Sequence, residues 1–185
     1  EAARDPERIP ADVEPGLSGE ADFDMNKRHT FPFGAHVSVV EVDTETGRVT
    51  LLRHITVDDS GRILNPLLAE GQIHGGVAQG IAQAIYEEIL YDEEGNPLTG
   101  SLFTYQMPSA PDLPVIEAHR TETPTDLNPL GAKGIGESGT IGSTPAVQNA
   151  VIDALSHLGV RHIDLPLSPE RVWRAIHQRE SPSPS

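Results

Sequence analysis

The stretch Gly131–Val151, GAKGIGESGTIGSTPAVQNAV, decides between two kinds of fold. Gly134, Gly136 and Gly139 stand in a G-x-G-x-x-G arrangement ahead of a helix-like run, as in a dinucleotide-binding βαβ unit. That motif needs a strand leading into its glycines, whereas TDLNPLGAK precedes them here, with Pro129 and no β-branched run. A phosphate-binding P-loop fits no better, because its lysine directly follows the last glycine and precedes Ser or Thr.

The alternative for this stretch is a tight loop that carries Glu137 at the start of a helix. The glycines allow the backbone to turn sharply and to present N–H groups, which makes a ready anion site. Two interpretations of Glu137 stay open from the residues alone. It is either a solvated glutamate in the first helical turn beside Lys133, or a carboxylate held in a rigid loop as a general base.

Hydrophobic periodicity in the rest of the chain predicts a mixed α+β fold. Strand-like runs at Ala35–Val42 and Val49–Val57 flank a turn at Thr44–Gly47 and predict a hairpin. Apolar residues recur every three or four positions over Pro66–Ile89 and predict a helix. Further predicted elements are a turn at 91–100, a strand from Val115, a helix at Thr144–Leu158, a short strand at 162–168, and a terminal helix capped by Ser168.

The predicted helix at Pro66–Ile89 is unusually rich in glycine and alanine. Glycine in a helix interior costs about 1 kcal/mol relative to alanine. Two explanations stay open, which are close packing against another helix and close approach of the backbone to a ligand.

Composition excludes several classes of function. The formal net charge is −15, and an acidic surface repels phosphate backbones, so we expect no nucleic-acid partner. The sequence has no cysteine, which excludes disulfides, thiolate metal sites and cysteine nucleophiles within it. Its eight histidines form no H-x-H or H-x-x-x-H pair, so no metal site is predicted. No apolar stretch approaches ~18 residues and no signal peptide is visible, so we expect a cytoplasmic protein without a membrane span.

The chain divides into a lead-in, one domain and a tail. Residues 1–30 are polar with scattered prolines and predict an extended or disordered lead-in. The predicted domain covers 31–179, and 180–185 is a short tail. Because the chain starts at Glu1 without an initiating methionine, we expect a fragment or a processed product.

Three segments carry a resemblance to a known family: VDDSGRILNP (57–66), EGQIHGGVAQGIAQAIYEE (70–88) and GAKGIGESGTIGSTPAVQNAVIDAL (131–155). Together they resemble the C-terminal part of the large, molybdenum-binding subunit of the xanthine oxidase family, and within it the aerobic carbon monoxide dehydrogenase large chains and their relatives. The resemblance runs from about Thr30 to Gln178. It implies that the domain is the C-terminal portion of the family's second molybdenum-cofactor-binding domain.

The resemblance also implies a chemistry. The family's large subunit holds a molybdopterin, here expected in its cytosine dinucleotide form, and passes electrons from a small substrate to iron–sulfur and flavin subunits. The substrate class is carbon monoxide, an aldehyde or an N-heterocycle. The residue that matches Glu137 lies beside the molybdenum and acts as a base. The positions expected to bind the cofactor are Ser60, Gly61, Asn65, Gln72, Lys133, Gly134, Gly136, Ser138 and Thr140.

The sequence also departs from the family. The large subunits are several times longer, and they carry an N-terminal cofactor domain and a substrate loop that are not found here. Many close relatives have a cysteine where Ser60 stands. We therefore expect the chain to be inactive by itself and to act with the rest of a large subunit. The alternative is a non-catalytic truncated domain that folds but binds no cofactor.

Overall fold

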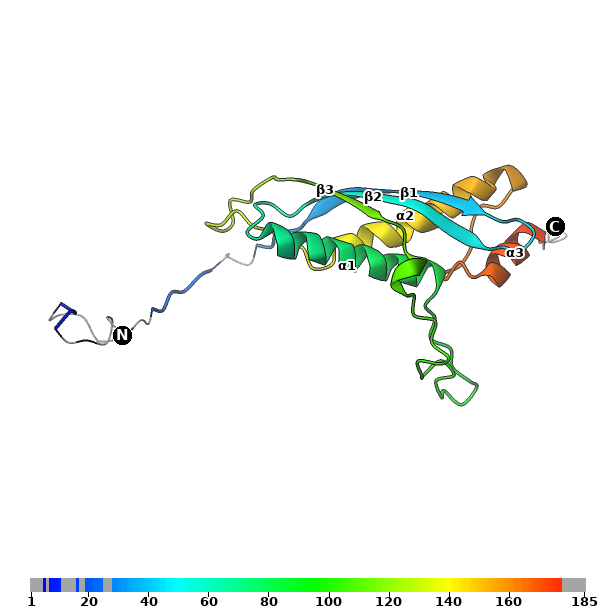
Figure 1. Cartoon of the computed structure of the whole chain (residues 1–185), viewed down its shortest axis with the longest axis horizontal. Coiled ribbons are helices and arrows are strands. Elements are labelled where there is room, and N and C mark those ends of the chain that lie inside the picture. The colour runs from blue at the N-terminus through cyan, green and yellow to red at the C-terminus, as the bar shows by residue number, and fades with distance from the viewer. Residues whose placement is uncertain (1–4, 6, 11–15, 17–18, 25–27, 178–185) are drawn as a thin grey trace.

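The structure, a computed structural model, describes residues 5, 7–10, 16, 19–24 and 28–177. Within them, a three-stranded sheet is covered on one face by two long helices (Figure 1). The predicted α+β class is confirmed. In chain order the elements are β1 (Phe33–Val42), β2 (Val49–Asp59), α1 (Pro66–Ile85), the short 3₁₀ turn η2 (Ala110–Asp112), β3 (Ile116–Thr121), α2 (Ser138–Leu155), a second 3₁₀ turn η3 (Ser156–Leu158) and α3 (Pro169–His177).

Strands β1 and β2 form the predicted antiparallel hairpin, and each strand is two residues longer than predicted. The side chain of Asp43 starts the turn, because its Oδ1 accepts the N–H groups of Glu45 at 2.9 Å and Thr46 at 3.3 Å. Gly47 completes the turn with a φ of +74°, which favours glycine. The hairpin therefore follows from local turn chemistry and alternating side chains.

Strand β3 pairs with β2 in parallel, from His54 opposite Ile116 to Asp59 opposite Thr121, so β2 is the central strand. Helix α1 lies in the connection between them, and the predicted strand from Val115 is confirmed. The same connection contains residues 89–109, called the arm below, which project from the body of the fold (Figure 1). The predicted turn at 91–100 lies within the arm.

Helices α1 and α2 run parallel and touch through small residues. The Thr140 hydroxyl donates to the Gly76 carbonyl at 2.9 Å, and four residues farther along both helices Thr144 donates to Gly80 at 3.1 Å. A Cβ at Gly139 would lie 2.7 Å from a backbone oxygen of α1. Close helix packing, the first of the two explanations for the helical glycines, thus accounts for Gly76 and Gly80.

The predicted start of α2 is wrong, because the helix begins at Ser138 rather than Thr144 and keeps Pro145 in its interior. Proline removes a backbone donor, which is why a helix start next to it is expected from the sequence. The small residues before Pro145 adopt helix because they allow the close contact with α1, a tertiary effect that local propensity does not contain.

The predicted end of α1 is also wrong, since the helix stops at Ile85 and not at Ile89. The N–H groups of Tyr86 and Glu87 both donate to the Ala82 carbonyl, at 2.8 and 2.9 Å, so the regular bonding pattern ends there. The chain then leaves the body as the arm.

The short strand predicted at 162–168 does not form. Its apolar side chains, Ile163 and Leu167, bury in the core, while the Leu167 N–H donates to the Ala84 carbonyl of α1 at 2.7 Å. The alternation of this segment therefore reports packing against helices instead of a sheet. The most deeply buried apolar residues of the core are Val77, Ile81, Ala84, Val147, Val151, Leu155, Leu167 and Val172.

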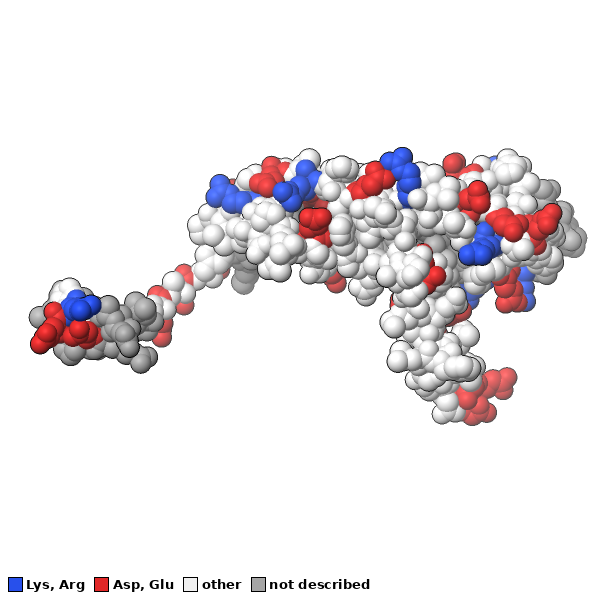
Figure 2. All heavy atoms as spheres, in the orientation of Figure 1, with Lys and Arg blue, Asp and Glu red and all other residues white. Residues whose placement is uncertain are grey.

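The ends of the chain are only partly described. The described residues among 1–30 include no helix or strand, and the remainder of that lead-in and the 180–185 tail lie outside the described residues. Within the described part of the chain, no helix is both long and apolar enough to cross a membrane. Figure 2 shows acidic and basic side chains mixed over the body, while the arm is largely uncharged apart from acidic residues at its tip.

Candidate functional site

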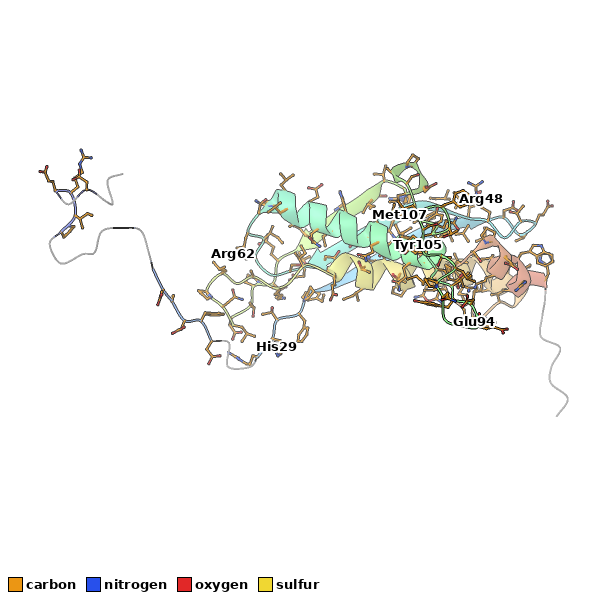
Figure 3. The ribbon with its side chains drawn as sticks, turned by 90° about the horizontal axis from the view of Figure 1, so that it is seen from below. His29, Arg48, Arg62, Glu94, Tyr105 and Met107 are labelled. Atoms are coloured by element: carbon orange, nitrogen blue, oxygen red, sulfur yellow. The ribbon has the colours of Figure 1, made fainter. Side chains whose placement is uncertain are left out.

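The loop after β2 and the glycine loop before α2 lie against each other. The Lys133 N–H donates to the Ser60 carbonyl at 2.8 Å, and the Arg62 N–H donates to the Gly131 carbonyl at 2.9 Å. Figure 3 shows Arg62 at the end of the molecule where α1 begins, far from Arg48. Two of the three segments that were predicted to share a site therefore meet at this end.

Helix α1 joins them through Gln72, whose side-chain amide donates to the Gly136 carbonyl at 3.0 Å. A cavity of about 260 Å³ lies between the three segments. Its lining includes Ser60, Asn65, Gln72 and Lys133, four of the residues expected to bind a cofactor. The structure thus brings these four of the predicted site residues together around one cavity.

Ser60 is the most informative of these residues. Its side chain is 3% exposed, and its Oγ is the one buried side-chain polar atom among the described residues without a hydrogen-bond partner. Leaving a buried hydroxyl unpaired costs about 1–3 kcal/mol. Ser60 also lines a second cavity of about 330 Å³, which extends toward Ala118 and Arg120. The hydroxyl is therefore available to a polar group that enters the site.

Four glycines, two in α1 and two in the loop before α2, face open space. A Cβ added to Gly71, Gly75, Gly134 or Gly136 would have no atom within 4 Å. Packing within the described chain does not account for them, in contrast to Gly76 and the glycines of α2. Close approach of an external group, the second explanation offered for the helical glycines, remains for these four. Gly75 was among the helical glycines singled out from the sequence, whereas Gly71 was not, although its four-residue spacing from Gly75 puts the two on one face of α1.

Glu137 is the N-cap residue of α2 and is exposed. Its position directly before a helix agrees with the sequence, but its carboxylate makes no hydrogen bond to the helix and lines neither of the two cavities. The exposure of Glu137 agrees with the interpretation as a solvated glutamate, although the Lys133 ammonium binds Asp59 at 3.1 Å; the role of Glu137 as a general base stays a prediction. Among the described residues, the Glu137 carboxylate has no hydrogen-bond partner, and it lies at a helix N-terminus, where the backbone favours negative charge.

Several of the expected cofactor ligands have roles in folding. Asn65 caps α1, since its Oδ1 accepts the Leu68 N–H at 3.2 Å. Gly61 has a φ of +68°, and a Cβ there would lie 2.4 Å from the Gly131 carbonyl oxygen. The Thr140 hydroxyl is used between the helices, as described above. The open positions of the predicted set are therefore Ser60, Gly134, Gly136 and Glu137.

A buried carboxylate, Asp59, fixes the two loops to each other. Its oxygens accept the Gly61 N–H at 3.0 Å, the Thr121 hydroxyl at 3.0 Å and the Lys133 ammonium at 3.1 Å. Burial raises the pKa of Asp59, but these hydrogen bonds and one from Thr123 outweigh it and lower the pKa to about 2. Lys133, which also lies 4.8 Å above the Phe33 ring, is therefore held as a structural cation.

A second buried polar cluster lies between the sheet and α2. Asp58 accepts hydrogen bonds from Thr56 and Ser138, and the His36 Nε2 lies 3.3 Å from its Oδ2. Burial raises the pKa of Asp58, but the bonds from His36, Ser138 and Thr56 hold it below its usual value. Burial, with a smaller contribution from His36, lowers the pKa of His54 to about 4.

This cluster was not predicted, although the sequence contains a signal for it. His54, Thr56 and Asp58 alternate along β2, so all three point to the helix-covered face of the sheet. Among the described residues, no group of three or more His, Asp or Glu side chains is placed to hold a metal ion. The cluster is therefore a hydrogen-bonded network.

Comparison with known proteins gives the same assignment. A family model described as "Molybdopterin cofactor-binding domain" matches residues 5–114. The chain is 40% identical over 169 residues to the carbon monoxide dehydrogenase large chain of Hydrogenophaga pseudoflava, covering 91% of this chain and 21% of that one. It is 43% identical over 171 residues to the nicotine 6-hydroxylase large subunit of Paenarthrobacter nicotinovorans, covering 92% and 21%.

The fold agrees as well. The structure of reconstituted CO dehydrogenase from Oligotropha carboxidovorans matches with a TM-score of 0.82 at 38% identity, over 91% of this chain and 21% of that chain. The chain thus spans about a fifth of the length of these relatives, and it is homologous to part of the large subunits of molybdenum-containing oxidoreductases. By its sequence and by its fold, the chain belongs to the molybdopterin cofactor-binding domain family.

Proposed function

We propose that this chain forms one wall of a molybdopterin site in a molybdenum hydroxylase large subunit and supplies Glu137 as its base. The observation that carries the proposal is the convergence of the loop after β2, the first half of α1 and the glycine loop before Glu137 around one cavity, with the unpartnered Ser60 hydroxyl in its lining. Family membership gives the cofactor class. The geometry supplies the surface on which that cofactor would lie.

The residues fit such a group in shape and in chemistry. The open glycines let a bulky ligand approach the backbone of α1 and of the 131–137 loop without steric conflict. Ser60 offers a buried hydroxyl, and the N-terminus of α2 favours the negative charge of a phosphate. The cavity of this chain alone, about 260 Å³, lies below the volume usual for a small-molecule site. The rest of a large subunit would therefore complete the pocket, and the cytosine dinucleotide form is the one we propose.

In this site the bound molybdenum group supplies the oxygen-transfer and electron-accepting chemistry. Glu137 accepts a proton, because its carboxylate is exposed and bonded to no other described side chain. Gln72 holds the carbonyl of the preceding Gly136, which fixes the loop beneath the base. The Ser60 hydroxyl would donate a hydrogen bond to the cofactor or accept one from it.

The partners follow from the same reasoning. As the family resemblance implies, electrons would leave through partner subunits that carry iron–sulfur and flavin groups. The names of the relatives favour a small substrate, either carbon monoxide or an N-heterocycle, with aldehydes as a further class suggested by the matching aldehyde oxidoreductase structures. Substrate choice would depend on residues supplied by the rest of the subunit.

The test is Glu137→Gln in a full-length large subunit assembled with its partners. The substitution keeps the size of the side chain but removes its ability to accept a proton. We expect turnover per bound molybdenum to fall by roughly 10²–10⁴-fold, with molybdenum content unchanged. The matched control is Glu94→Gln at the exposed arm tip, which should leave turnover unchanged.

Equal turnover in Glu137→Gln and in the unaltered enzyme would remove Glu137 from the mechanism. Loss of molybdenum in the variant would make its role structural. The alternative, a domain that folds but binds no cofactor, is tested with the 185-residue chain alone. We expect that chain to retain no molybdenum, and retention would show that one wall of the site is sufficient.

A further inference from the structure

We propose that Asp58 is a positioning residue for Glu137 and that it acts through Ser138. The two neighbours of Glu137 are both anchored: Gln72 binds the Gly136 carbonyl at 3.0 Å, and Asp58 accepts the Ser138 hydroxyl. The Glu137 side chain itself makes no hydrogen bond to any residue that the structure describes. Its placement is therefore determined by the residues on either side of it.

The second anchor, Asp58, is a buried carboxylate that accepts hydrogen bonds from the side chains around it. Asp58 as a carboxylate only accepts, and the Thr56 hydroxyl donates to it. The His36 Nε2 therefore carries a hydrogen, which faces the Thr56 hydroxyl oxygen at 2.8 Å and the Asp58 carboxylate at 3.3 Å. The His36 Nδ1 is then an acceptor for the His54 Nε2–H at 3.3 Å, and the His54 Nδ1 accepts the Ser38 hydroxyl at 2.9 Å. With both histidines neutral, one choice of tautomers thus gives every hydrogen bond in the series from Ser38 to Asp58 a donor and an acceptor. The depressed pKa of His54 agrees with its neutral form.

Helix α2 rests on this cluster at two successive turns. Ser138 binds Asp58, and four residues later Gly142 lies against the His36 ring, where a Cβ would be 2.5 Å from a ring carbon. The side chains of His36 and Asp58 are 2% and 5% exposed. Hydrogen bonds to a desolvated carboxylate are stronger than those between neutral groups. The start of α2, and with it Glu137, is therefore set by the sheet.

The structural part of the proposal is tested by amide hydrogen exchange on the 185-residue chain. The Ile141 N–H closes the first turn of α2 by donating to the Glu137 carbonyl at 3.0 Å, so its protection reports whether that turn is held. We expect Ser138→Ala and Asp58→Asn each to speed exchange at Ile141 by about tenfold, with Val151 in the middle of α2 unaffected. The matched control, Asp164→Asn, alters a carboxylate that is 89% exposed and should change neither site.

The double variant Asp58→Asn/Ser138→Ala decides whether the two residues act together. If Asp58 acts through Ser138, the double variant should exchange no faster at Ile141 than the faster single variant. The proposal would be overturned if the increase in exchange rate at Ile141 in the double variant equalled the product of the two single increases. Unchanged exchange at Ile141 in Ser138→Ala would overturn it as well.

The catalytic part rests on the proposed function and is tested in the assembled enzyme. We expect Ser138→Ala to lower turnover per bound molybdenum by about tenfold with KM little changed, since the base is displaced and the substrate site is not. In a Glu137→Gln background the same substitution should have no further effect. A normal rate in Ser138→Ala together with a large loss in Glu137→Gln would refute the positioning role of Asp58 and leave the proposed function standing. A normal rate in Glu137→Gln would refute the proposed function and leave the exchange result standing.

Discussion

Two helical glycines should respond oppositely to the same substitution. Gly75 lies in α1, where an added Cβ would have no atom within 4 Å, whereas a Cβ at Gly139 of α2 would lie 2.7 Å from the Ile73 oxygen and 2.8 Å from the Val77 nitrogen. Both opposing atoms are backbone, so no side-chain rotation can relieve the contact. Gly139→Ala therefore forces the helices apart, while Gly75→Ala does not.

The magnitudes follow from the two environments. Gly75→Ala gains helix propensity and should stabilise the fold by about 0.5–1 kcal/mol. Gly139→Ala gains at most the same amount but overpacks a helix contact, which typically costs about 1–3 kcal/mol. The expected net loss is about 1–2 kcal/mol. For a chain of this size, the two variants should differ in Tm by roughly 5–10 °C.

Urea unfolding of the two variants, followed by circular dichroism, measures the difference. A stabilising Gly139→Ala, or a destabilising Gly75→Ala, would refute the account of the helix contact. The substitution at Gly75 also bears on function, because its open face is the one that the cofactor is proposed to approach. In an assembled large subunit, Gly75→Ala should lower molybdenum content despite its greater stability.

Two further predictions concern buried polar groups. Ser60→Ala removes an unpaired buried hydroxyl, so the 185-residue chain should gain about 1 kcal/mol in urea unfolding, while the assembled subunit should lose molybdenum. The pKa of His54 is about 4 in the folded chain and 6.5 in the unfolded chain. Because the unfolded chain takes up the proton first, the free energy of unfolding is highest above pH 6.5 and falls by about 3 kcal/mol as the pH drops toward 4. In His54→Gln, the loss of unfolding free energy between pH 7 and pH 4.5 should be smaller; an unchanged loss would show that His54 does not titrate as described.

Local signals in the sequence predicted much of the fold. The β1–β2 hairpin follows from alternation around the Asp43–Gly47 turn, and α3 begins where Ser168 caps it, with the Arg171 N–H 3.4 Å from its hydroxyl. Helix α1 follows from apolar residues at helical spacing, whereas its N-cap, Asn65, was expected only to bind the cofactor. Each of these features is decided by residues close together in the chain.

What the sequence did not predict depends on contacts between distant residues. The start of α2 depends on glycines of α1 some sixty positions earlier, and the partner of Lys133 is Asp59 rather than the nearby Glu137. Of the candidate site residues, the structure assigns Asn65, Gly61 and Thr140 to folding contacts. Motif recognition selects such positions together with the open ones, and only the contacts separate the two groups.

The parallel pairing of β2 with β3 has a consequence for how quickly the chain folds. The paired residues His54 and Ile116 are separated by 62 positions, and both α1 and the arm lie in that interval. Closing a long loop is an entropic cost that comes before the contacts it permits, so β1–β2 zipping should precede docking of β3. Since the cost rises only by about 0.6 kcal/mol for each doubling of the loop, the arm can vary in length among homologues with little effect on equilibrium stability. The penalty for a longer arm falls instead on the rate at which the sheet is completed.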